Sequence, residues 1–99
     1  MISEPVTMSG NKTATGAISA RPAVLAVIDI SPPDTGVVVL KIYDNTAASG
    51  TVIARLDVAA GTDSLNNIGF LRQANKGLHA ELSGTYTGTI NFNVGFVAQ

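Results

Sequence analysis

The sequence predicts an all-β protein, a single antiparallel β-sandwich or jelly-roll-like barrel of about six to eight short strands with an extended N-terminal arm. Short β-branched runs alternate with clusters of Gly, Pro, Asn, Asp and Ser, at the spacing that such folds require. Several runs alternate apolar and polar residues with a period of two, and no segment between the turn clusters fits a helix. The 99 residues provide for one domain.

The beginning of the chain differs in texture from the rest. Residues 1–12 include Pro5 and Gly10 and have no apolar periodicity, so we expect a flexible arm ahead of a β-sandwich domain over residues 13–99. The segment from Met1 to Pro5 has neither a basic nor an apolar stretch, and we expect no signal peptide. The longest apolar run is too short for a membrane span, so no membrane partner is expected.

Three segments predict strands with one apolar face. Residues 51–58, 78–83 and 89–96 each alternate an apolar residue with a polar or small one. In the last segment, Phe92 and Phe96 point toward the predicted core. Turn clusters separate the predicted strands, and they lie at residues 31–36, 44–50, 61–64, 75–77 and 83–88.

Two further segments are apolar on both faces. A strand of a two-layer sandwich buries only one face in its own core, so residues 23–28 and 37–40 need a second cover. A neighbouring subunit, the arm or another protein can provide it, although small side chains left partly exposed are an alternative. We expect one specific partner surface here, which also includes a Tyr exposed at a hairpin tip. The expected contact residues are Val24, Val27, Val37, Val39 and Tyr86.

Charge and composition exclude several functions. The net charge is −1 and the six Lys and Arg residues are scattered singly, so we expect no nucleic-acid partner. Because the chain has no Cys, it has no disulfide, thiolate nucleophile or Cys-based metal site. The glycines form neither a dinucleotide-binding motif nor a phosphate-binding loop, and we expect no cofactor.

The sequence offers little catalytic chemistry. Ser83, His79 and Asp57 could be combined into a triad, but no nucleophile motif surrounds the serine, and we expect that the chain is not an enzyme and has no catalytic residue. His79 and Glu81 share a strand face, yet two ligands do not make a metal site.

The carboxylates lie at strand ends and in loops. Capping of turns explains them, while calcium binding by converging loops stays open as an alternative. At the 44–50 turn, we expect Asp44 and Asn45 to cap main-chain N–H groups and Gly50 to adopt a positive φ. The residues concerned are Asp29, Asp34, Asp44, Asp57 and Asp63.

A family resemblance rests on the central half of the chain. The stretch LKIYDNTAASGTVIARLDV, a short linker strand and then KGLHAELSGT resemble the small β-sandwich virion proteins of tailed bacteriophages, of the head decoration, cement or fibre type. Where the group commonly has an aromatic residue after Gly-Leu, this sequence departs from the pattern and has His79. The matching residues form turn and packing motifs, and they are Tyr43-Asp44, Gly50, Val52-Ile53, Gly77-Leu78 and Ser83-Gly84.

The resemblance implies a non-enzymatic capsid decoration or cement protein. Such a protein is made in the host cytoplasm, resides on the capsid surface of the virion and stabilises the phage head through subunit contacts. Its expected partners are copies of itself, with a homotrimer favoured, and the major capsid protein or other virion proteins. The alternatives are a phage tail or fibre component, or a carbohydrate-binding β-sandwich module that uses the loops at 44–50 and 83–88.

Overall fold

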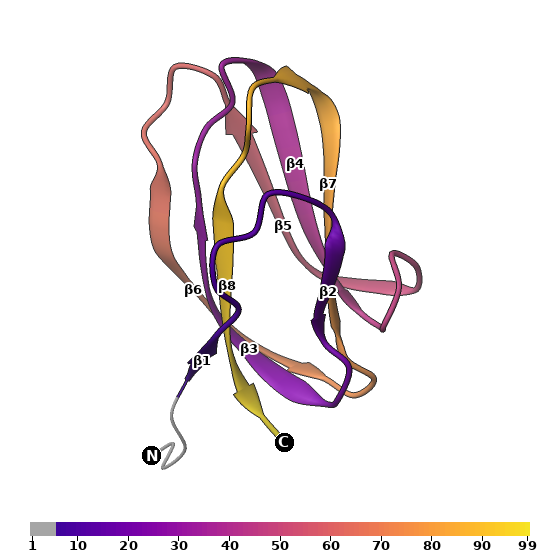
Figure 1. The fold of residues 1–99 in the computed structure, drawn as a ribbon. Helices are drawn as coiled ribbons and strands as arrows, with labels where there is room; N and C mark the ends of the chain where they lie inside the picture. The colour runs from indigo at the N-terminus through magenta and orange to yellow at the C-terminus, as the bar shows by residue number, and fades with distance from the viewer. Residues whose placement is uncertain (1–5) are drawn as a thin grey trace.

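The computed structural model describes residues 6–99, except for the side chain of Asn67. Eight strands in this range form two antiparallel four-stranded sheets that pack face to face, which confirms the predicted all-β sandwich (Figure 1). Residues 1–5 lie outside the described residues. They belong to the predicted arm, and the expectation of no signal peptide was based on them. The strands are β1 (Thr7–Met8), β2 (Gly16–Ser19), β3 (Ala23–Ile30), β4 (Thr35–Asp44), β5 (Thr51–Ala59), β6 (Leu65–Ala74), β7 (Leu78–Thr87) and β8 (Phe92–Ala98).

The strand order is that of a jelly roll. The first sheet has the order β1-β8-β3-β6 and the second has the order β2-β7-β4-β5. The first half of the chain pairs with the second half as one long antiparallel ribbon, β1 with β8, β2 with β7, β3 with β6 and β4 with β5. The ribbon is wrapped so that β3 also pairs with β8, and β4 with β7. The sequence left open a two-sheet sandwich or a closed barrel. Because the two sheets stay separate, the architecture is a sandwich with jelly-roll topology.

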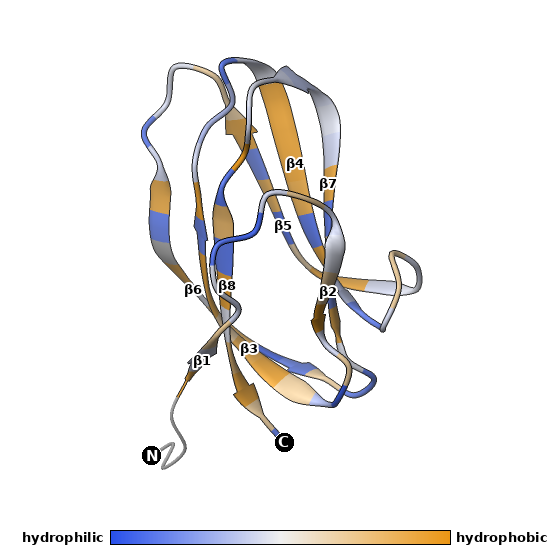
Figure 2. Ribbon diagram, viewed as in Figure 1, coloured by the Kyte–Doolittle hydropathy of each residue, from blue (hydrophilic) through white to orange (hydrophobic). Residues whose placement is uncertain are grey.

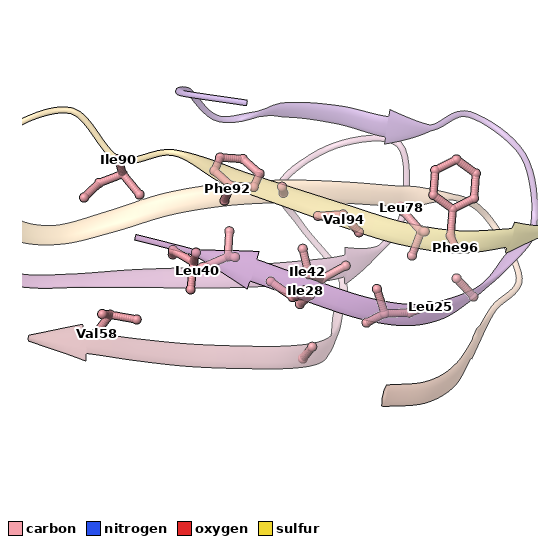
Figure 3. Packing of buried hydrophobic residues seen from close by; sticks show 14 of the residues in the cluster. Leu25, Ile28, Leu40, Ile42, Val58, Leu78, Ile90, Phe92, Val94 and Phe96 are labelled. Atoms are coloured by element: carbon pink, nitrogen blue, oxygen red, sulfur yellow. The ribbon is translucent and has the colours of Figure 1, made fainter. Parts of the chain in front are cut away.

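The core fills the space between the two sheets (Figure 3). Alternate residues of each strand point inward, as the period of two predicts. In β3, a register shift between Leu25 and Val27 interrupts the alternation, so that Leu25 and Ile28 both point inward. The largest fully buried side chains are Phe92, Leu25, Ile28, Ile30, Leu40, Ile42, Leu78, Ile90, Val38 and Val94.

Two boundaries differ from the sequence prediction. The turn expected at 83–88 is wrong for most of its length, because β7 continues to Thr87 and pairs with β4. The strand expected over 89–96 begins only at Phe92, although Ile90 is still buried, with 1% of its surface exposed. Residues in the loop before β8 thus contribute to the core without belonging to a strand.

The described part of the arm lies on its own domain. The Ser9 N–H donates to the Val94 carbonyl at 2.8 Å, and Lys12 and Phe92 exchange two main-chain hydrogen bonds of 2.7 and 2.9 Å. These hydrogen bonds continue the edge of the first sheet beyond β8, although the backbone departs from an extended conformation at Gly10, where φ is 82°.

Asn45 caps the turn between β4 and β5 as predicted, whereas Asp44 caps the turn after β6 instead. The Asn45 side chain accepts a hydrogen bond from the Thr46 N–H at 2.8 Å and donates to the Ser49 carbonyl at 3.0 Å. Gly50 has a φ of 88°, which confirms its expected positive value. Asp44 accepts a hydrogen bond from the Lys76 N–H at 2.8 Å, so its carboxylate links this turn to the turn after β6.

The core position of Ile28 predicts a large loss of stability on truncation. Ile28→Ala should lower the free energy of unfolding by about 2–5 kcal/mol, because the side chain is fully buried and leaves a cavity. Val37→Ala is the control, because Val37 is 40% exposed, and it should change the value by less than about 0.5 kcal/mol. Urea denaturation followed by circular dichroism measures both, and equal losses would contradict the assignment of the core.

The Asp44 carboxylate predicts a pH dependence. Its pKa is lowered from the ordinary value of 3.8, chiefly by the hydrogen bond from the Lys76 N–H. A lowered folded-state pKa stabilises the fold above the unfolded-state pKa, and this contribution is lost as the pH falls through the folded-state pKa. Asp44→Asn keeps a hydrogen-bond acceptor but removes the charge. The variant should therefore be less stable than the unchanged protein at neutral pH, and urea titrations should show the difference shrinking below about pH 4. A difference independent of pH would contradict this role.

Candidate functional site

The structure divides the predicted contact residues among three places. Val24 and Val27 lie on the outer face of the first sheet, and Val37 and Val39 lie on the outer face of the second. Tyr86 was expected at an exposed hairpin tip, but it lies within β7, is half-buried and packs against the core. The expectation of one surface built from both apolar segments is therefore wrong, because the two sheets point their outer faces in opposite directions.

The outer face of the second sheet is charged. Lys41 of β4 pairs with Arg55 of β5 on one side and with Glu81 of β7 on the other. The Arg55 guanidinium donates to the Asp57 carboxylate at 2.9 and 3.2 Å, which lowers the pKa of Asp57. Glu81 also accepts a hydrogen bond of 3.1 Å from the Tyr43 hydroxyl. This band of charges keeps the middle of the face polar.

Exposed apolar residues do not gather on this second face. Val37 and Val52 are 40% and 42% exposed, but they occur at opposite ends of the β4–β5 ladder. Val39 lies between them and pairs with Asp57 and Ser83. The charge band thus separates Val37 from Val52, and the face offers no continuous apolar surface.

The outer face of the first sheet carries an apolar cluster, which we name the valine patch. Val24 pairs with Val97, and Val27 and Met8 both pair with Gly95, so that these residues share the outer face. Val97 is only 4% exposed, although it lies outside the core cluster. The valine patch consists of Val6, Met8, Val24, Val27 and Val97.

Gly95 explains how β1 covers part of the valine patch. A Cβ at this position would lie 2.5 Å from Val27 Cγ1, 2.8 Å from Met8 Sδ and 3.0 Å from Val6 Cγ1. These three side chains therefore occupy the space above Gly95. The arm is one of the covers considered from the sequence, and it covers the face only in part, because Val6 and Met8 are still 46% and 43% exposed.

The free edge of β6 borders the same sheet. Within residues 6–99, β6 pairs with β3 alone, over a length of 10 residues. Arg72 is its single charged residue, and Leu71 is 78% exposed. The opposite edge, β1, has two residues, and the edge strand β5 carries the Arg55–Asp57 ion pair. Short strands and charged side chains commonly protect sheet edges from pairing with another chain. β6 is long and has one charged residue, so its edge is poorly protected.

The residues considered for catalysis do not assemble. His79 and Ser83 both lie on β7, four residues apart, which corresponds to about 13 Å along a strand. Ser83 and Asp57 are both paired with Val39, so the valine lies between them. His79 is half-buried, and its Nδ1 atom is buried without a hydrogen-bond partner.

The carboxylates of the described chain do not converge either. Among residues 6–99, no group of three or more His, Asp or Glu side chains could hold a metal ion. The same range contains no helix of the length and hydropathy needed to cross a membrane.

The residues that carry the resemblance to phage virion proteins lie in the second sheet and its loops. Tyr43 and Asp44 end β4, Gly50 precedes β5, and Leu78 and Gly84 belong to β7. No protein-family model, curated protein or solved structure matches the chain. The resemblance therefore depends on these residues alone.

The packing above Gly95 predicts an asymmetry between two glycines that flank Val27. Gly95→Ala should lower the free energy of unfolding by about 1–3 kcal/mol, because the new methyl group would collide with Val27 and Met8 and displace β1. Gly69 also pairs with Val27, but a Cβ there would have no atom within 4 Å, so Gly69→Ala is a matched control without a loss.

Urea denaturation of the two glycine variants measures the stabilities, and amide hydrogen exchange of residues 7–9 measures the release of β1. Equal stabilities, or unchanged exchange at β1 in the Gly95 variant, would show that the contact does not hold the arm.

Proposed function

We propose that the chain is a non-enzymatic structural protein of a virion, a capsid decoration or cement protein that binds neighbouring subunits. The observation that carries the proposal is the partly covered valine patch beside the long free edge of β6. The resemblance to phage virion proteins gives the type of assembly, and a tail or fibre component stays the alternative.

The physical basis is the cost of leaving such a surface in water. Clustered apolar residues on one sheet face are typical of contact sites, because their burial against a partner removes apolar area from water. Leu71 and Met8 add exposed apolar area at the two edges of that sheet. The edge of β6 offers main-chain donors and acceptors to an incoming strand, which gives the contact a fixed orientation.

The chemistry of the surface defines its partner. The valine patch has no charged residue, so the partner surface should be apolar and should not depend on steering by charge. A second copy of the chain fulfils this condition, and so does an apolar surface of a capsid subunit. The jelly-roll topology does not decide between functions, because both capsid proteins and lectins use it.

Substitutions on the two outer faces test the proposal. Sedimentation of the full chain should show a homo-oligomer, and Val27→Asp should convert it to a monomer because the patch then carries a charge. Val39→Asp is the matched control, because Val39 is also a half-buried outward valine but lies next to the charge band, and the oligomer should persist.

A variant on an exposed position separates contact from folding. Leu71→Lys should fold, since its side chain is 78% exposed, and it should weaken association. Circular dichroism checks the fold of each variant. A folded protein that stays monomeric at high concentration, or an oligomer lost equally in the Val39 variant, would contradict self-assembly through the valine patch.

A further inference from the structure

A small polar hollow lies at the other end of the outer face that carries the valine patch. The hollow measures about 200 Å³, which is less than the roughly 300–1,000 Å³ of typical ligand pockets. Four of the chain's seven asparagines line it, together with one carboxylate and two serines. The polar residues that concern the argument are Asn11, Asp29, Ser31, Asn66, Asn91 and Asn93.

Distant segments of the chain bring these side chains together. Asn11 belongs to the loop after β1, Asn66 to β6, and Asn91 and Asn93 to the beginning of β8. Asp29 of β3 pairs with Asn93, so it lies in the centre of the group. Figure 2 shows the hydrophilic parts of β6, β8 and the loop after β1 at the same level of the sheet.

Hydrogen bonds hold the walls of the hollow in place. The Asn11 side chain donates to the Asn91 side-chain oxygen at 3.0 Å. The Ser31 hydroxyl accepts from the Asn91 N–H at 2.9 Å and is 3.2 Å from the Asn91 carbonyl. The Ser9 hydroxyl donates to the Asn93 side-chain oxygen at 3.1 Å. The amides of Asn11, Asn91 and Asn93 are thus oriented before any ligand arrives, which lowers the entropic cost of binding.

The side chains around the hollow select the chemistry of a ligand. Amides present donors and acceptors together, and a hydroxyl group of a ligand needs both. Among the described residues around the hollow there is no Lys, Arg or His, so an anion or a phosphate would find no counter-charge. A single carboxylate, Asp29, is also too little for calcium, whose sites usually combine several carboxylates.

We propose that this hollow binds one residue of a neutral carbohydrate through the hydroxyl groups of the sugar ring. Asp29 accepts from sugar hydroxyls, and the amides of Asn66 and Asn93 both donate and accept. The site is separate from the loops at 44–50 and 83–88, where the sequence placed a carbohydrate-binding alternative. The inference does not depend on the proposed assembly function, because it uses no residue of the valine patch.

Sugar titrations of the full chain, followed by amide chemical shifts, test the inference. The probes are glucose, galactose, mannose and N-acetylglucosamine, each added to millimolar concentrations, with calcium chloride in a parallel titration. At least one sugar should shift the amide signals of residues 11, 29, 66, 91 and 93, and calcium should not. Shifts with calcium alone, shifts elsewhere on the protein, or no shift with any of the four sugars would overturn the proposal.

Variants show whether the polar side chains carry the binding. Asp29→Ala and Asn66→Ala should each weaken the affinity for the sugar about tenfold or more, since each removes hydrogen bonds to the ligand. Asn75→Ala is the control, because Asn75 is an exposed asparagine in the turn after β6, and its affinity should be unchanged. Equal affinity in all three variants would overturn the assignment of the site.

The Leu71→Lys variant separates this inference from the assembly function. It should still bind the sugar when its association is weakened, because Leu71 does not line the hollow. Loss of sugar binding together with association would place the binding at the subunit contact and overturn the hollow as the site.

Discussion

The pairing of the first half of the chain with the second half is the constraint on which the structure depends. Three of the four ribbon pairs join strands that lie far apart in the sequence. Only β4 and β5 are consecutive and form a hairpin. Wrapping the ribbon makes β3 and β8 the inner strands of the first sheet and β4 and β7 those of the second, each with a neighbour on both sides. β3 has the most apolar sequence of the strands, with seven apolar residues of eight, which agrees with its central position.

The two outer faces differ because of the neighbours that the ribbon gives to each central strand. In the second sheet, β5 and β7 place Asp57 and Ser83 beside Val39 of β4, and Arg55 and Glu81 beside Lys41, so the middle of that face is polar. In the first sheet, β6 and β8 place Gly69 and Gly95 beside Val27. Glycines cannot shield a valine, and the space above Gly95 admits the side chains of β1 instead. The same apolar pattern therefore gives a polar face in one sheet and, in the other, an apolar patch that β1 covers in part.

Local patterns predicted much of the fold. The period of two placed β5 and most of β7 and β8, and the Asn45 turn followed from its side-chain chemistry, because these features depend on neighbouring residues. The sheet order, the register shift near Ala26 and the inward position of Tyr86 could not be predicted, since each is set by a partner strand distant in sequence.

The candidate sites show the same limit. Val24 and Val27 were found because an apolar run is visible in the sequence, but nothing local shows that Val37 and Val39 belong to the opposite face. The polar hollow was missed because Asn11, Asn66 and Asn91 are scattered along the chain and converge only in the folded sheet. The sequence did contain one indication of the hollow, because asparagines occur repeatedly beside the apolar strand segments.

The arm links the two ends of the outer face of the first sheet. Met8 lies over Gly95 in the valine patch, while Ser9 bonds to Asn93 and Asn11 bonds to Asn91 in the hollow. A partner that covers the patch from outside leaves these bonds intact. A partner strand that displaces β1 from β8 pulls on Ser9 and Asn11 as well, and the hollow then loses part of its wall. Since the free energies of linked sites are reciprocal, a ligand that holds Asn11 in place also opposes the displacement of β1. The route by which a partner reaches the first sheet therefore determines whether the two sites act independently.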